Sequence, residues 1–309
     1  MSTSQLHVGG WPNGGAFMVR STSQPGEVWL AEHDKARHLA ALNPGLSPVH
    51  TARRISWTRR GERLAAGILV PHGPAPETGW PLVVNVYGGS RASTLVDEYD
   101  PDNGILHASL LTSRGWAVMF PDLPISDHDP MRQFAPLLRS ALDNLPHNLV
   151  DPSRIAIIGN SYGSYTALSL LVTMPGTFSA AAVSAPLANP IASHAALRSD
   201  GAAFDGFWER AQGRMSDPPW VNPQTWVDNS PFLHLDHIDS PLLIAVGTHG
   251  IPGEQAQAEQ LFAGLRRLNR TTELRHYNGE GHSPSTWSPA AYTDFAQRLL
   301  TWIGASTPI

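Results

Sequence analysis

The chain has 309 residues, of which 41% are hydrophobic and 15% charged, with a formal net charge of −5 and no cysteine. This composition excludes a disordered chain, disulfides and Cys-based metal sites, and without basic clusters it predicts no nucleic-acid binding. No stretch approaches the roughly 18 apolar residues of a membrane helix, and the N-terminus has no apolar signal core. We therefore expect a cytoplasmic protein without membrane contact.

The first part of the chain predicts a small β extension. Residues 1–20 show no apolar period and are expected to form a loose tail, although the stretches 17–20 and 27–30, separated by turn residues, predict a hairpin. The stretches 54–58 and 64–70 flank the turn Arg59-Arg60-Gly61-Glu62 and predict edge strands. We place an N-terminal extension at residues 1–54 and one larger domain at residues 55–309.

From residue 81 onward, continuous apolar strands alternate with helices, as in a parallel sheet covered on both faces. Strands are expected at 82–86, 117–120, 155–158, 180–184, 242–246 and 274–277, and helices at 104–114, 133–144, 161–172, 254–268 and 290–304. This order predicts the α/β-hydrolase fold, a mostly parallel central sheet with helices on both faces. The segment of about 191–230 has no strand and should form a small cap beside the active site.

The sequence Gly159-Asn160-Ser161-Tyr162-Gly163 joins the predicted strand 155–158 to a predicted helix. A G-x-S-x-G segment in that context is a nucleophile elbow, in which a sharp turn presents the serine hydroxyl above the edge of the sheet. The helix that follows places backbone N–H groups beside the developing oxyanion. Ser161 is therefore the predicted nucleophile.

A serine nucleophile needs a base, and in this fold the chain order is serine, acid, histidine. Of the 14 histidines, His282 follows the last predicted strand on the glycine-rich loop Asn278-Gly279-Glu280-Gly281, where the fold presents its base. The oxyanion should be bound by the backbone N–H of Tyr162 and by a donor from the loop Val86-Tyr87-Gly88-Gly89. Tyr87 can supply its phenolic O–H or its backbone N–H.

Together these segments resemble the catalytic domain of the prolyl oligopeptidase family of serine peptidases. The resemblance covers about residues 55–304, and its motifs are Leu82 to Gly89, Val118 to Asp122, Val150 to Gly163, Gly213-Arg214-Met215, Asn229-Ser230-Pro231 and Asn278 to His282. It implies that Tyr87 donates to the oxyanion and that Tyr162 borders the pocket for the residue before the cleaved bond. It also implies a small peptide or peptide-like substrate.

Two departures from the family pattern stand out. Family members usually carry a β-propeller over the active site, whereas about 50 residues precede the hydrolase region here, enough for a remnant of one blade. Without the propeller the site should be more open, and folded proteins would have to be excluded by the cap or by homo-oligomerisation. The second departure is Gly250, which stands where the family places its catalytic aspartate.

Three explanations of the missing aspartate stay open. Glu254, at the start of a predicted helix, can reach back to His282 as a substitute acid, or it can simply cap that helix. A Ser161–His282 dyad can act alone, at a loss of about 10⁴-fold in turnover. Alternatively, the pocket has lost hydrolysis and serves binding or another reaction.

The leading prediction is a serine hydrolase that cleaves a peptide, or an amide or ester resembling one, through an acyl-enzyme on Ser161. The alternatives are an esterase, thioesterase or peptide-tailoring enzyme of a biosynthetic pathway, which would remove a leader or close a ring, and a non-hydrolytic binding protein. No metal or organic cofactor is implied, and Asp127-His128-Asp129 is expected to be a solvated loop. In the cap, Arg214, Trp208, Trp220 and Trp226 could line the substrate pocket or pack against the core.

Overall fold

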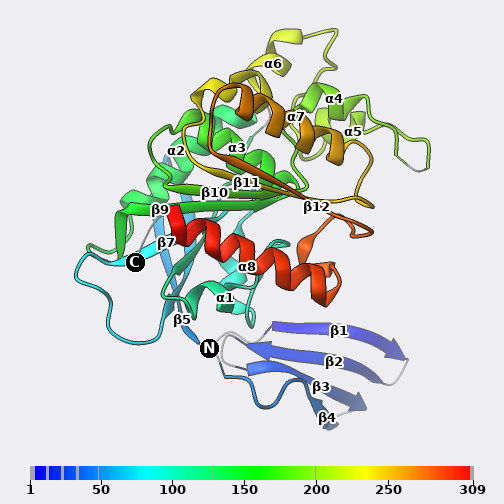
Figure 1. The fold of residues 1–309 in the computed structure, drawn as a ribbon. Helices are drawn as coiled ribbons and strands as arrows, with labels where there is room; N and C mark the ends of the chain where they lie inside the picture. The colour runs from blue at the N-terminus through cyan, green and yellow to red at the C-terminus, as the bar shows by residue number, and fades with distance from the viewer. Residues whose placement is uncertain are drawn as a thin grey trace.

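A computed structural model describes residues 4–11, 14–21, 24–32, 35–47, 49–126, 128–198 and 200–306. Its strands form two sheets, a small four-stranded one at the start of the chain and an eight-stranded one in the main body (Figure 1). The small sheet has the order β1-β2-β3-β4 and is antiparallel throughout. Its strands are β1 (Ser4–Trp11), β2 (Gly14–Ser21), β3 (Gln24–Glu32) and β4 (Lys35–Ala41).

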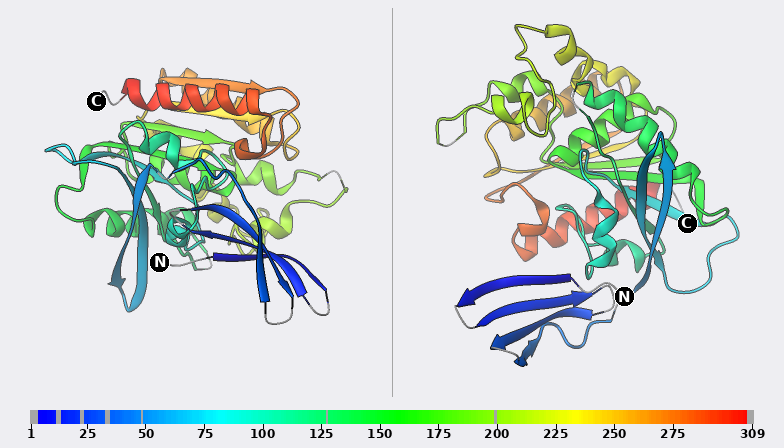
Figure 2. Two further views of the ribbon diagram at one scale, coloured as in Figure 1. Left: turned by 90° about the horizontal axis from the view of Figure 1, so that it is seen from below. Right: turned by 180° about the vertical axis from the view of Figure 1, so that it is seen from behind.

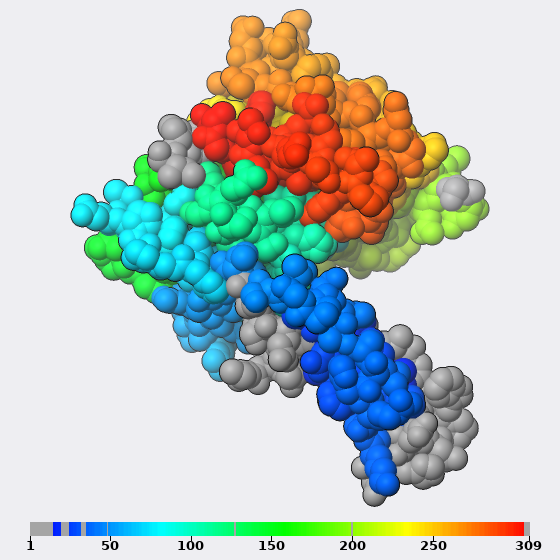
Figure 3. Space-filling model, turned by 60° about the horizontal axis from the view of Figure 1, so that its bottom comes forward, coloured from blue at the N-terminus to red at the C-terminus, as the bar shows by residue number. Residues whose placement is uncertain are grey.

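The predicted hairpin corresponds to β2 and β3, in which Phe17 lies opposite Trp29. The expected loose tail over residues 1–20 is wrong, because most of that segment forms β1 and β2. These two strands pair through their backbones from Ser4 opposite Arg20 to Trp11 opposite Gly14. Backbone pairing does not require an apolar period in the sequence, so the lack of one did not exclude strands here. Figure 3 shows the described part of the small sheet projecting from one side of the main body.

The large sheet has the strand order β12-β11-β10-β9-β7-β8-β6-β5. Neighbours from β12 to β8 are parallel, while β6 is antiparallel to both β8 and β5. The strands are β5 (His50–Arg59), β6 (Glu62–Pro71), β7 (Trp80–Asn85), β8 (Ala117–Pro121), β9 (Val150–Asn160), β10 (Ala180–Ser184), β11 (Leu242–Gly247) and β12 (Thr272–Tyr277). Each strand predicted from an apolar run is present.

Helices cover both faces of this sheet, as Figures 1 and 2 show. One core contains Phe134, Leu168 and Leu261, from α2 (Pro130–Asp143), α3 (Tyr162–Thr173) and α7 (Glu254–Arg267). The core on the opposite face contains Leu111 and Leu299, from α1 (Ala108–Thr112) and α8 (Pro289–Ser306). Burial of apolar side chains on both faces explains why the central strands are continuous apolar runs.

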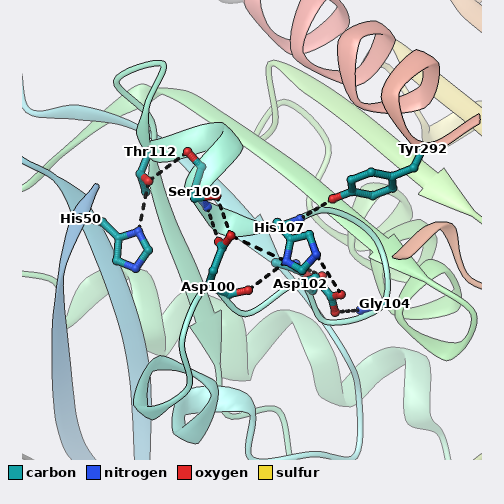
Figure 4. Close-up of polar contacts among 9 residues, drawn as sticks. His50, Asp100, Asp102, Gly104, His107, Ser109, Thr112 and Tyr292 are labelled. Atoms are coloured by element: carbon teal, nitrogen blue, oxygen red, sulfur yellow. Dashed lines mark hydrogen bonds and ion pairs between the residues drawn. The ribbon is translucent and has the colours of Figure 1, made fainter. Parts of the chain in front are cut away.

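The predicted helix over residues 104–114 is much shorter than expected, since α1 contains only Ala108–Thr112. The residues before it form turns that are held by two aspartates (Figure 4). Asp102 accepts a hydrogen bond from the Gly104 N–H at 2.8 Å, and Asp100 accepts from both the backbone N–H and the hydroxyl of Ser109 at 2.6 Å. These side-chain bonds satisfy the backbone locally in place of helical ones.

The segment predicted as a cap has short helices and turns. Its helices are α4 (Pro190–His194), α5 (Asp205–Glu209) and α6 (Pro223–Asp228). Outside this segment, short 3-10 helices occur at η1 (Ala92–Asp97), η2 (Pro231–His237) and η3 (Pro284–Thr286). An ion pair between His194 and Glu209, 2.8 Å apart and largely buried, joins α4 to α5. The described helices include none long and apolar enough to cross a membrane.

Candidate active site

Ser161 occupies the turn between β9 and α3 with a strained backbone conformation, φ 57° and ψ −122°. Such a conformation costs about 1–3 kcal/mol and has to be held by its surroundings. The Ser161 N–H donates to the Ser184 carbonyl at 3.1 Å, and the Ser161 carbonyl accepts from the Tyr165 N–H at 3.2 Å. A Cβ at Gly159 would lie 2.2 Å from the carbonyl oxygen of Gly163, so the close approach of the two chain segments requires glycine.

The structure brings Glu254 and His282 together. Nδ1 of the imidazole lies 2.5 Å from Oε1 of the carboxylate, and the Glu254 side chain is only 3% exposed whereas that of His282 is 30% exposed. The other carboxylate oxygen, Oε2, accepts the backbone N–H of Ile251 at 3.0 Å. Within the described part of the chain, neither Nδ1 nor Oε1 meets the geometry of a hydrogen bond with any partner, so the two groups are joined by close contact and not by a well-aligned hydrogen bond. The carboxylate is thus fixed between one backbone donor and the imidazole.

Gly250 provides the space that this carboxylate occupies. A Cβ at residue 250 would lie 2.3 Å from Oε2 of Glu254, closer than two such atoms can approach. An aspartate at this position would therefore compete with the Glu254 carboxylate for the same volume. The glycine at the expected aspartate position and the glutamate four residues later are two parts of one arrangement.

Asn160 connects the serine turn to the histidine loop, and the sequence analysis did not single it out. Its Nδ2 donates to the hydroxyl of Ser283 at 3.0 Å, and its Oδ1 accepts from the hydroxyl of Ser184 at 2.7 Å. Asn160 precedes the nucleophile and Ser283 follows the predicted base, so this bond holds the two catalytic segments side by side. A hydrogen bond between residues 123 positions apart leaves no periodic signal in the sequence.

No hydrogen bond joins the Ser161 hydroxyl to His282 among the described residues. Bonds of this kind are often long in a site without substrate and tighten when the substrate binds. The Asn160–Ser283 bond and the Glu254–His282 contact already limit where the imidazole can lie.

The two residues predicted to supply the oxyanion donors have neighbouring side chains. The rings of Tyr87 and Tyr162 have centroids 6.2 Å apart, and within the described residues no acceptor takes the backbone N–H of Tyr162. The adjacent Gly88 N–H donates to the Thr166 hydroxyl at 2.9 Å, which fixes the Tyr87 loop against α3. The Tyr87 side chain is half-buried.

The Tyr162 ring is fully buried below this site. Burial raises the pKa of its phenol, the charge of Arg214 opposes that rise, and Tyr87 adds to it. Arg214 is therefore close enough to act on Tyr162 electrostatically. Its backbone carbonyl accepts the His128 N–H at 3.0 Å, which ties this part of the cap to the loop before α2.

The three cap tryptophans that could line the pocket or pack against the core lie in different environments. Trp208 is fully buried, with its ring centroid 6.4 Å from that of Tyr162 and 5.5 Å from that of Tyr165. Of the two alternatives left open for Trp208, lining the pocket or packing against the core, its burial favours packing, and Trp226 is equally buried. Trp220 is 75% exposed, and its ring meets the edge of the His194 ring.

Asp127, which belongs to the predicted solvated loop, lies outside the described residues. Beside it, the Asn229 amide donates to the Asp129 carboxylate at 2.9 Å, and the His128 Nδ1 lies 3.0 Å from the Ser216 hydroxyl. Nowhere in the described part of the chain do three or more His, Asp or Glu side chains gather in a way suited to a metal ion.

Comparison with solved structures identifies the fold. The acylaminoacyl peptidase of Pyrococcus horikoshii superposes with a TM-score of 0.79 at 16% identity, covering 97% of this chain and 49% of that one. A puromycin-hydrolyzing peptidase of Mycobacterium tuberculosis gives a TM-score of 0.74 at 18% identity, covering 96% of this chain and 46% of that one. The predicted α/β-hydrolase fold is therefore confirmed.

Sequence comparison identifies the family. The uncharacterized peptidase YuxL of Bacillus subtilis is 25% identical over an alignment of 247 residues that covers 74% of this chain and 35% of that protein. The chain thus spans about a third of the length of this relative and about half that of the solved structures. The model of the prolyl oligopeptidase family matches residues 132–307, more than half of the chain. The chain belongs to the prolyl oligopeptidase family.

Proposed function

We propose that this protein is a serine hydrolase that cleaves a peptide, or an amide or ester resembling one, through an acyl-enzyme on Ser161. The observation that supports this most is the buried Glu254 carboxylate 2.5 Å from Nδ1 of His282. With this contact, Ser161, Glu254 and His282 follow the order serine, acid, histidine that is typical of the α/β-hydrolase fold, and the acid lies at the start of α7.

In the proposed mechanism, Ser161 Oγ attacks the substrate carbonyl while Nε2 of His282 accepts its proton. Glu254 holds the imidazole with its proton on Nδ1 and stabilises the imidazolium. The Tyr162 N–H and Tyr87 donate to the oxyanion. His282 then protonates the leaving group, and water, activated by the same imidazole, releases the acid product from Ser161.

The names of the related proteins support an amide bond as the target. The relative and the two solved structures are described as a peptidase, an acylaminoacyl peptidase and a puromycin-hydrolyzing peptidase. The leaving groups implied by these names differ. We therefore propose the bond class without a residue preference.

The proposal is tested by labelling the full chain and Ser161→Ala with a fluorophosphonate probe and locating the adduct by mass spectrometry. Labelling confined to Ser161 is the expected result, because only an activated serine reacts readily. A folded wild-type protein that does not label would favour the non-hydrolytic binding protein. Turnover of p-nitrophenyl esters without any release from peptide pools would instead favour the esterase.

A further inference from the structure

A pocket of about 430 Å³ lies beside the oxyanion loop, the segment Val86-Tyr87-Gly88-Gly89, and takes no part in the proposed chemistry. Three segments form it: the tip of the β5–β6 hairpin, the loop that follows β8 and the first half of α2. The residues that line it are Arg59, Arg60, Glu62, Pro124, Ile125, Ser126, Arg132, Gln133, Pro136 and Leu137.

The lining of this pocket is positively charged. Its carboxylate, on Glu62, is already paired, because the guanidinium of Arg91 lies 2.6 Å away. Arg59 and Arg60 have no ion-pair partner among the described residues. Arg132 faces Asp129 and Asp228 only at 3.8 and 3.7 Å, and its side chain is 70% exposed. Arg59 and Arg60 thus bring positive charge to the pocket that no described carboxylate pairs, and Arg132 adds a charge that two aspartates partly offset.

The pocket is separated from the oxyanion loop by one side chain. Ile125 lines the pocket, and its Cγ1 lies 3.7 Å from the Cβ position of Gly89, two residues after Tyr87. The nucleophile follows β9, and the pocket loop follows β8, which is two places along in the order β9-β7-β8. At about 4.8 Å per strand the two sites are on the order of 10 Å apart or slightly more. About three to five residues of extended peptide span that distance.

We propose that this arginine pocket binds a carboxylate of the substrate, three to five residues from the bond that is cleaved. An acidic side chain and a C-terminal carboxylate offer the same chemistry, since planar guanidinium groups pair with either. This inference rests on the proposed function of Ser161 and assigns a preference for acidic peptides to it. The Ser126 backbone N–H and hydroxyl both donate to Oε1 of Gln133, at 2.9 and 3.0 Å, so these two residues satisfy each other, and among the described residues Arg59 and Arg60 keep guanidinium groups without an ion-pair partner.

The test measures binding to the full chain carrying Ser161→Ala, so that it does not depend on catalysis. The probes are rhodamine-labelled hexapeptide pools, capped as C-terminal amides, with Glu or Gln fixed at one position and the other positions randomised. A third set carries Gln with a free C-terminal carboxylate. Fluorescence anisotropy should show about tenfold tighter binding of Glu pools over Gln pools at one or two adjacent positions, the effect of one charge-assisted hydrogen bond. A preference confined to the third set would identify the terminal carboxylate.

In the double variant Arg59→Gln/Arg132→Gln, the same anisotropy measurement should show no preference for the acidic pools. Arg139→Gln is the matched control, because Arg139 is an exposed arginine on α2 that does not line the pocket. Equal affinity for all three sets of pools, absence of binding in all pools, or a preference that survives in the double variant would each overturn the proposal. Fluorophosphonate labelling of Ser161 in the same arginine variants, with the serine restored, separately reports whether the proposed nucleophile is active.

Discussion

Replacing Glu254 by glutamine tests the role of this residue with almost no change of shape. In the native site Oε2 accepts the Ile251 N–H at 3.0 Å, and Oε1 faces Nδ1 of His282. If the amide oxygen of the substituted side chain keeps the Ile251 bond, its NH₂ group faces Nδ1, which must then act as an acceptor. The imidazole proton moves to Nε2, and His282 can no longer accept the proton of Ser161. The opposite amide orientation places two N–H donors against each other, at a cost of about 1–3 kcal/mol.

The expected loss in kcat is therefore about 10⁴-fold, as when the aspartate of a serine protease triad becomes asparagine. That loss equals about 5.5 kcal/mol of transition-state stabilisation. Turnover of p-nitrophenyl butyrate and the rate of fluorophosphonate labelling measure it, and the melting temperature checks the fold. Glu259→Gln is the control, since Glu259 lies on the same helix and pairs with His276 at the surface. A Glu254→Gln protein that keeps a third of wild-type kcat would refute the reasoning.

A double substitution tests whether the position of the carboxylate matters more than its origin in the chain. Glu254→Ala empties the volume in which a Cβ at Gly250 would lie 2.3 Å from Oε2. Gly250→Asp combined with Glu254→Ala should then recover turnover by a factor of about ten or more relative to Glu254→Ala, since one carboxylate again faces the imidazole. Gly250→Asp alone should lower turnover, because two carboxylates compete for one space.

Three further substitutions test other parts of the site and fold. Tyr87→Phe should lower kcat by about 10²–10³ with an unchanged melting temperature, because it removes one oxyanion donor; an unchanged kcat would leave the backbone N–H groups as the donors. Asn160→Ala should slow labelling of the nucleophile by about tenfold or more while the protein stays folded, since the bond from Asn160 to Ser283 holds the two catalytic segments together; equal labelling rates would contradict this. Burial lowers the pKa of His50, and the charge of Asp100 only partly opposes it (Figure 4), so protonation favours the unfolded state. Stability from this group is present above about pH 6.5 and lost as the pH falls below it, and the melting temperature of His50→Gln should fall less than that of the wild type between about pH 7.5 and 5.5.

Local sequence signals predicted the central sheet well. Buried strands such as β10 and β11 are continuous apolar runs, and the elbow at Ser161 has a turn signature of its own. The same signals over-predicted the helix at 104–114, because the turns before Ala108 depend on side-chain bonds from Asp100 and Asp102. The helical spacing of apolar residues carries no information about these side-chain hydrogen bonds.

Contacts between distant segments were beyond sequence reasoning. Whether Glu254 reaches His282 depends on where α7 lies relative to the loop after β12, so capping and catalysis stayed equal alternatives until the structure placed the two side chains. For Trp208 the sequence leaves pocket lining and core packing open, because aromatic side chains suit both. Its full burial behind Tyr162 follows from how the cap folds onto α3.

A glycine at position 250 together with a glutamate at position 254 affects how members of the family that lack the usual aspartate should be classified. A survey that counts triad residues column by column would score this chain as a degenerate, inactive relative, because its aspartate column holds glycine. Glu254 nevertheless places a carboxylate oxygen 2.5 Å from the imidazole, from a side chain one methylene longer and four residues later in the chain. A glycine at the usual acid position together with a glutamate four residues downstream is therefore a better search pattern than the aspartate alone for hydrolases hidden among apparent pseudoenzymes.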